Sequence, residues 1–120
     1  MKAINSYIAA WNAETSEDRD SLLQSCLTSD VIYIDPHAPE PVQGIDGMQA
    51  LIETFRSRFD HQLIVEGNID QHHDVFRLRW RLQQENGDIL SRGLMVGDLT
   101  HAEPKLLKRI VQFVDTNSDS

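Results

Sequence analysis

The chain is poor in several features that mark specialised proteins. Its 120 residues include one cysteine, Cys26, so no disulfide can form within the chain. No apolar run approaches the roughly 20 residues that a membrane-spanning helix needs. The start MKAINSYIAAWNAE has polar residues where a signal peptide keeps an apolar stretch. We therefore expect a cytoplasmic protein that does not enter a membrane.

Positive charge is also scarce, with 11 lysines and arginines against 19 aspartates and glutamates and a formal net charge of -8. Binding to a polyphosphate backbone needs clustered cations, so nucleic acid is not an expected partner. The glycines form no phosphate-binding motif, and no HExxH or CxxC spacing occurs. The run His72-His73-Asp74 does not change this, because neighbouring residues of a strand point to opposite faces. We expect neither a metal site nor a cofactor.

What the chain does have is enough apolar sequence for one core, with 40% hydrophobic and 25% charged residues. We predict a single domain over residues 1–115. The polar end TNSDS, residues 116–120, has nothing to bury and is expected to be a mobile tail.

Three helices are predicted from apolar spacing. Ile4, Ile8 and Trp11 recur at helical intervals in the first, and Thr15 with Asp18 resembles a capping box ahead of the second. The second helix contains the apolar set Leu22, Leu23, Cys26 and Leu27, in which Cys26 reads as a small buried side chain. The third has a continuous apolar stripe of Met48, Leu51, Ile52, Phe55 and Phe59.

Alternating patterns predict the strands. VIYID lies between the second and third helices, and from His61 onward the alternation continues through Phe76, Leu78, Trp80 and Leu82. Asn86-Gly87 is a strong hairpin signal before a strand from about Ile89 to Leu99. The last strand spans roughly Leu106 to Asp115. This order predicts an α+β fold in which helices cover one face of a four-strand antiparallel meander.

Asp35 is the most informative single residue. Val31, Tyr33 and Asp35 share one face of the predicted strand, so a carboxylate lies on the same side as an aromatic ring and just before a proline-rich loop. Such an acid either accepts a proton in a pocket or caps the following turn, because aspartate before proline is common at turn starts. Both interpretations stay open at this point.

The order of these segments resembles the SnoaL-like branch of the nuclear transport factor 2 superfamily over nearly the whole chain. The segments are YIAAWN, IYIDP followed by Gly44, FRSRFDHQL, DQHHDVFRLRW and IVQFVD. The resemblance implies a cone in which a strongly curved, mostly antiparallel sheet holds three N-terminal helices in its concave face around a deep apolar pocket. It also implies a homodimer. Enzymes and non-catalytic binding modules both use this scaffold, so the fold alone does not give the function.

Ketosteroid isomerases within this superfamily place a catalytic aspartate at an Asp-Pro step similar to Asp35-Pro36. The comparison puts Trp11 and Met95 where those enzymes have the two hydrogen-bond donors of their oxyanion hole. Met95 has no proton to donate. The familiar donor pair is therefore not reproduced, although the position of the base is.

We accordingly expect a small-molecule-binding domain whose apolar pocket is centred on Asp35 and receives an apolar or carbonyl-containing molecule. If it is an enzyme, the resemblance implies cofactor-independent isomerisation, cyclisation or dehydration with Asp35 as general base. Tyr33, His37 and His72 are the candidate donors. The predicted pocket wall comprises Trp11, Phe55, Phe59, Trp80 and Met95. The alternative is a non-catalytic binding or dimerisation module in which Asp35 is a turn cap.

Overall fold

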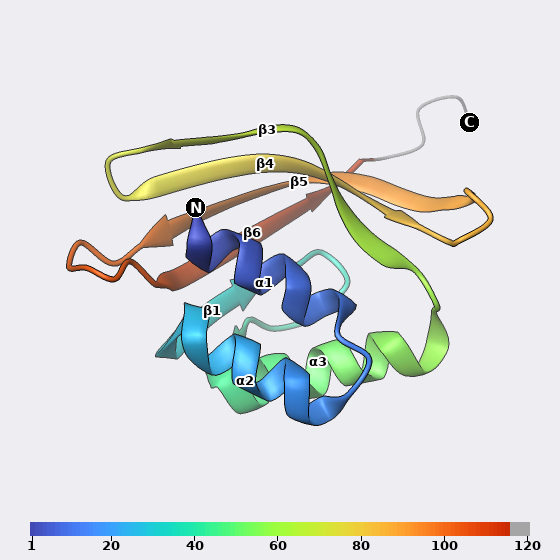
Figure 1. The fold of residues 1–120 in the computed structure, drawn as a ribbon, viewed down its shortest axis with the longest axis horizontal. Helices are drawn as coiled ribbons and strands as arrows, with labels where there is room; N and C mark the ends of the chain where they lie inside the picture. Colours follow the sequence, from blue (N-terminus) through green and yellow to red (C-terminus); the bar gives the residue numbers. More distant parts are fainter. Residues whose placement is uncertain (116–120) are drawn as a thin grey trace.

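The computed structural model describes residues 1–115, and the predicted tail at 116–120 lies outside the described residues. Three helices and six strands form the domain (Figure 1). The helices are α1 (Lys2–Asn12), α2 (Ser16–Cys26) and α3 (Gly44–Arg58). The strands are β1 (Leu27–Ile34), β2 (Val42–Gln43), β3 (Gln62–His72), β4 (Val75–Gln83), β5 (Ile89–Leu99) and β6 (Leu107–Val114).

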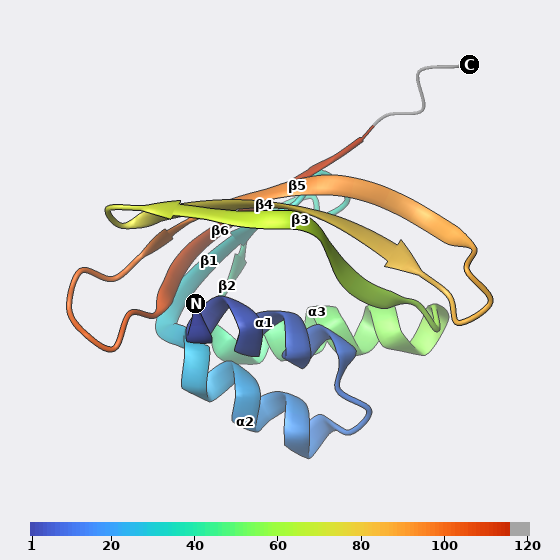
Figure 2. The ribbon, with the colours of Figure 1, turned by 45° about the horizontal axis from the view of Figure 1, so that its top comes forward.

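The strands make one sheet in the order β2-β1-β6-β5-β4-β3. Strands β3 to β6 form the predicted antiparallel meander, and β1 joins β6 in a parallel pair at its far side. The sheet arches over the helices, which all lie on its concave side (Figure 2). This is the predicted α+β fold with a curved, mostly antiparallel sheet.

Curvature of the sheet has a local cause in β3. The pairing of β3 with β4 shifts register between Glu66 and Asp70, and Gly67 inside that interval has a φ of +75°. Glycine reaches this left-handed conformation without a steric penalty. Between these pairs β3 advances four positions while β4 advances two, and such a bulge bends the strand. Figure 1 shows β3 turning sharply toward the end of α3 on the N-terminal side of this stretch.

The helices are tied to one another and to the sheet by two polar side chains, one partly buried and one buried. The side chain of Asn12 pairs with the backbone of Leu63, donating to its carbonyl at 2.9 Å and accepting from its N–H at 2.7 Å, so the end of α1 is attached to β3. The guanidinium of Arg19 is buried and donates to the carbonyls of Ala10 and Ala13 at the end of α1. A cation at that position also complements the negative end of the helix dipole.

Two details of the sequence prediction are wrong. Leu27 was expected in the second helix but begins β1, with an extended backbone at φ -110° and ψ 149° and Leu107 of β6 as its neighbour. An apolar residue at the end of an amphipathic helix fits a strand start equally well, since both bury it. Phe59 was expected in the third helix and lies just beyond its end as the C-cap residue. The short strand β2 had no sequence signal.

The predicted capping of α2 is confirmed, because the Thr15 hydroxyl accepts from the backbone N–H of Asp18 at 3.1 Å. Cys26 is a buried free thiol, and burial raises its pKa to about 12. Among residues 1–115 no helix is long and apolar enough to span a membrane.

Candidate functional site

A cavity of about 560 Å³ lies between the helices and the concave face of the sheet. Its wall is predominantly apolar and draws on α1, α3 and every strand except β2. The residues that line it are Trp11, Tyr33, Asp35, His37, Leu51, Phe55, Phe59, Leu63, Trp80, Leu82, Leu90, Ser91, Gln112 and Val114. A hollow of this size and composition can enclose a small organic molecule.

Aromatic rings form one side of this cavity. Phe55 on α3 meets Trp11 on α1 edge to face with ring centroids 5.7 Å apart, and Phe59 lies 5.1 Å from Phe55 by the same measure. Phe55 lies in the last turn of α3, and Phe59, the C-cap residue just after the helix, packs beside it. Phe59 is 37% exposed, which places it where the cavity opens to solvent.

Asp35 lies at the polar end of the cavity, directly after β1, and is half-buried. Its Oδ2 accepts a hydrogen bond from the Tyr33 hydroxyl at 2.6 Å, and its Oδ1 accepts from the backbone N–H of His37 at 2.7 Å. The first bond ties the carboxylate to the cavity wall, and the second closes the turn that follows β1. The carboxylate therefore faces the cavity and caps the turn at once.

Tyr33 has its ring buried in the core at 1% exposure, and its hydroxyl reaches the cavity. Burial raises the pKa of Tyr33 well above its usual value, and the neighbouring Tyr7 and Asp35 raise it further. The phenol thus stays protonated and serves as a hydrogen-bond donor to Asp35. Tyr7 on α1 is also fully buried, and burial raises the pKa of its hydroxyl as well.

His37 is exposed at the rim of the same cavity. Its backbone N–H is committed to Asp35, while its imidazole makes no hydrogen bond within residues 1–115. The ring is therefore available to a bound molecule at the mouth of the cavity.

Gln112 is a cavity residue that the sequence analysis did not single out. It lies on β6, is 7% exposed, and its Oε1 accepts a hydrogen bond from the indole nitrogen of Trp80 at 2.8 Å. A signal was present, since Ile110, Gln112 and Val114 alternate on one face of the last strand. A polar residue between two apolar ones on the core side needs a partner or a ligand.

Two of the predicted site residues lie away from the cavity. Met95 is fully buried in the core on β5 and does not line the cavity wall. His72 ends β3 and is exposed, with its Nδ1 2.9 Å from Nδ1 of His73. The prediction for His72 used the alternation of β4, but a turn at His73 and Asp74 separates the two strands, and His73 has a φ of +52°. Alternation does not continue through such a turn.

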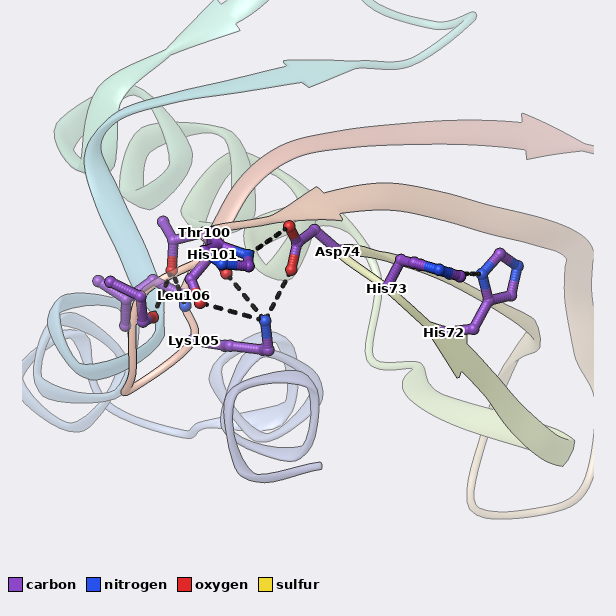
Figure 3. A network of polar contacts seen from close by, with 8 residues as sticks. His72, His73, Asp74, Thr100, His101, Lys105 and Leu106 are labelled. Atoms are coloured by element: carbon purple, nitrogen blue, oxygen red, sulfur yellow. Dashed lines mark hydrogen bonds and ion pairs between the residues drawn. The ribbon is translucent and has the colours of Figure 1, made fainter.

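Beyond His72 and His73, a separate polar network joins this turn to the β5–β6 connection (Figure 3). Asp74 accepts from Lys105 at 2.7 Å and lies 3.1 Å from Nδ1 of His101. The hydrogen bond from Lys105, followed by that from His101, lowers the pKa of Asp74. Thr100 closes the same connection by accepting from the N–H of Leu106 at 2.9 Å. Within residues 1–115 no three His, Cys, Asp or Glu side chains gather as metal ligands would.

No protein-family model matches the chain, and no curated protein matches it. Solved structures do. A candidate isomerase of the SnoaL-like family from Agrobacterium tumefaciens superimposes with a TM-score of 0.84 at 30% identity, over 95% of this chain and 95% of the relative.

Two further structures match at lower identity and show the fold alone. A candidate SnoaL-like polyketide cyclase from Jannaschia has a TM-score of 0.70 at 15% identity, over 95% of this chain and 83% of the other. A candidate ketosteroid isomerase from Kribbella flavida has a TM-score of 0.65 at 18% identity, over 96% and 76% of the two chains. The near-complete overlap with the Agrobacterium protein at 30% identity agrees with the resemblance drawn from the sequence, and the chain belongs to the SnoaL-like family.

Proposed function

We propose that the cavity binds a small, mostly apolar organic molecule and that Asp35 accepts a proton from it. The reaction class is cofactor-independent isomerisation, cyclisation or dehydration. One observation carries the proposal: a carboxylate, held by the Tyr33 hydroxyl at 2.6 Å, lies at one end of an apolar cavity of about 560 Å³. A positioned carboxylate is a general base for a carbon acid next to a carbonyl group.

The two hydrogen bonds of Asp35 position the base without occupying it fully. A carboxylate ion offers about four acceptor sites, and the bonds from Tyr33 and His37 use one on each oxygen. A further site on either oxygen is free for a substrate proton. After the transfer, the proton remains on Asp35 until it is delivered to another atom of the substrate, as an isomerisation requires, and no other reactant is needed.

The likeness to a candidate isomerase at 30% identity over 95% of both chains supports this class of reaction. The two chains superimpose over 95% of their lengths, although a common fold does not by itself transfer an activity.

A second candidate function has an observation of its own. The bond from the His37 backbone to Oδ1 of Asp35, at 2.7 Å, is what a turn-capping aspartate makes. In that case the cavity binds its ligand without catalysing a reaction, and Asp35 holds the loop at the mouth of the cavity. Both functions need the cavity, but only the first needs a group at position 35 that can take a proton.

The test uses 2-tetralone, a compact apolar ketone whose protons next to the carbonyl exchange with solvent. In D₂O, NMR follows the loss of those protons with wild-type protein and with Asp35→Asn, which keeps the size and an acceptor oxygen. If Asp35 is the base, exchange by the variant falls on the order of a hundredfold or more while binding persists. Glu85→Gln, an exposed carboxylate on the β4–β5 turn, is the matched control and should exchange like wild type.

Equal exchange by wild type and Asp35→Asn, with 2-tetralone bound to both, would instead establish the non-catalytic module. A failure of wild-type protein to bind any small apolar ketone, measured by its melting temperature, would contradict the ligand class itself.

We further propose that the protein is a homodimer, as the resemblance implies. Support comes from the convex face of the sheet, which no helix of residues 1–115 covers (Figure 2). There Leu94 pairs with Phe113 and Val96 with Val111 across β5 and β6, and Phe113 is 55% exposed. Sedimentation velocity of wild type and Phe113→Lys tests this, because a charge in a two-fold apolar contact should yield the monomer. The expected cytoplasmic location stays a prediction.

A further inference from the structure

The amide of Gln112 is held in one orientation by its partner in the core. Trp80 can only donate from its indole nitrogen, so the atom of Gln112 that lies 2.8 Å away must be the amide oxygen. The amide nitrogen, with its two hydrogens, consequently points away from Trp80. Both residues line the cavity and both are nearly inaccessible, at 5% and 7% exposure.

Gly93 makes this contact between non-adjacent strands possible. Trp80 is on β4 and Gln112 is on β6, with β5 between them. Trp80 is the register partner of Gly93, and a Cβ on Gly93 would lie 2.3 Å from Cζ2 of the indole. The indole therefore lies across β5 where the glycine leaves room for it, and its nitrogen reaches β6.

The donor side of the Gln112 amide is directed toward Tyr33. The bond to Trp80 uses the amide oxygen, and a side-chain hydrogen bond from Gln112 opposes the rise in the pKa of Tyr33, which places one amide hydrogen toward the phenol oxygen. The amide nitrogen carries two hydrogens, and the second has no partner among residues 1–115. A free donor hydrogen thus lies on the same side of the cavity as Tyr33 and Asp35.

We propose that Gln112 is the group that binds the acceptor oxygen of the ligand, and that Trp80 sets its specificity by keeping the amide nitrogen turned toward the cavity. The ligand class is a neutral carbonyl compound whose oxygen lies at Gln112 and whose neighbouring carbon faces Asp35. This deepens the function proposed above and rests on it. It supplies the hydrogen-bond donor that an enolate forming beside Asp35 requires.

A neutral ligand follows from the charges around this end of the cavity. Asp35 is the carboxylic acid of the lining, and no lysine or arginine among residues 1–115 lines the wall to balance a second carboxylate. The imidazole of the lining, His37, lies exposed at the rim and not in the buried part of the cavity. An anionic ligand would place two negative charges together in an apolar hollow, which is unfavourable.

The test measures the carbonyl group of the ligand directly. 2-Tetralone labelled with ¹³C at its carbonyl is bound to wild-type protein, and isotope-edited infrared spectroscopy records the carbonyl stretch. A hydrogen bond from Gln112 lowers the stretching frequency. In Gln112→Met, which keeps the length of the side chain and removes both donor hydrogens, the band should return to the position of a carbonyl in an apolar solvent.

Binding gives a second, independent measure. Tetralin has the same shape as 2-tetralone without the oxygen. The preference for 2-tetralone over tetralin should fall roughly five- to tenfold in Gln112→Met, as expected for one lost hydrogen bond. Ser91→Ala removes another polar group of the lining and tests Ser91 as the alternative donor. Gln24→Met, the same substitution at an exposed position of α2 outside the lining, is the matched control and should leave both the band and the preference unchanged.

Because Gln112→Met leaves the Trp80 nitrogen without an acceptor, the double variant Trp80→Phe/Gln112→Met is compared with Trp80→Phe to keep folding comparable. Of these two proteins only Trp80→Phe, which retains Gln112, should lower the carbonyl frequency, and by less than wild type, because Trp80 no longer holds the amide in one orientation. Both measurements are repeated in Asp35→Asn. The shift of the carbonyl band should persist there, whether or not the variant still catalyses proton exchange, so a failure of the proposed reaction and a failure of this inference can be told apart. An unshifted band in wild type, or a shift lost in Ser91→Ala rather than in Gln112→Met, would overturn the inference.

Discussion

The Tyr33 hydroxyl lies 2.6 Å from Oδ2 of Asp35, and the two residues are separated by one position at the end of β1. The alternation of a strand puts them on the same face, so this bond is a direct result of local sequence. Tyr33 is the donor in this hydrogen bond, because burial raises the pKa of Tyr33 and keeps the phenol protonated. Asp35 therefore enters the cavity as an acceptor with a permanent donor beside it.

Alkaline pH should unfold the protein through its tyrosines. The chain has two, Tyr7 and Tyr33, and burial raises the pKa of both above the usual 10.0. Below about pH 10 neither state loses these protons, so the two tyrosines do not change the stability with pH. Above it the unfolded state releases them while the folded state does not, and the free energy of unfolding falls by about 1.4 kcal/mol per pH unit for each tyrosine.

Absorbance of tyrosinate near 295 nm and circular dichroism, recorded in one alkaline titration, check this. The two signals should change together, because the phenols ionise only on unfolding. Tyr33→Phe should show a shallower loss of stability with pH. Tyrosinate absorbance that appears near pH 10 in a protein still folded would contradict the prediction.

Regular spacing made most of the fold predictable from the sequence. The third helix and the meander follow from apolar periodicity, and the Thr15 cap follows from side-chain chemistry. The boundary at Leu27 did not, since an apolar residue there suits either a helix end or a strand start, and pairing with Leu107, distant in sequence, decides it. Such long-range pairing leaves no local signal.

The site was predictable in part for similar reasons. The residues of the cavity wall on α1 and α3 follow from amphipathic spacing, and Asp35 follows from strand alternation. Gln112 was missed because its role depends on Trp80, a partner 32 positions away that reaches it only across Gly93. The sequence could not decide whether Asp35 is a base in the pocket or a cap of the turn, because the carboxylate makes both contacts. Its Oδ2 accepts from Tyr33 at the cavity wall, and its Oδ1 accepts from the His37 backbone in the turn.

Gly93→Ala should destabilise the protein by about 1–3 kcal/mol, the range for overpacking a core. The added Cβ would lie 2.3 Å from the Phe113 carbonyl oxygen and equally close to the Trp80 ring, neither of which can move freely. Urea unfolding measures the loss. Gly47→Ala is the matched control: its Cβ would meet only the end of the Val42 side chain at 3.0 Å, and alanine favours the helix. Equal stability of Gly93→Ala and wild type would contradict the packing described here.

Cys26 should be unreactive in the folded protein. It is buried, and burial raises its pKa to about 12, so almost no thiolate is present at pH 8. A thiol reagent such as dithionitrobenzoate should react slowly with native protein and within seconds to minutes in denaturant. The rate at which the reagent modifies Cys26 in native protein then measures how often the α2–β1 junction opens. Rapid reaction under native conditions would show that the thiol is accessible.

Acid should selectively weaken the contact between the β3–β4 turn and the β5–β6 connection. The hydrogen bond from Lys105 and then that from His101 lower the pKa of Asp74 below its usual 3.8. A carboxylate with a lowered folded-state pKa stabilises the fold above its unfolded value, and this contribution disappears as pH falls through the folded value. Asp74→Asn should therefore be less stable than wild type at pH 7 and equally stable near pH 2.

Urea unfolding of both proteins at the two pH values measures the difference, which should be small because Asp74 is partly exposed and its partners are screened by solvent. Asp20→Asn, at an exposed position of α2 without a side-chain hydrogen bond inside residues 1–115, is the control and should show no such pH dependence. High salt should reduce the Asp74 effect at pH 7, since the pair with Lys105 is electrostatic. A deficit in Asp74→Asn that persisted unchanged at pH 2 would mean that shape, and not charge, holds this end of the sheet.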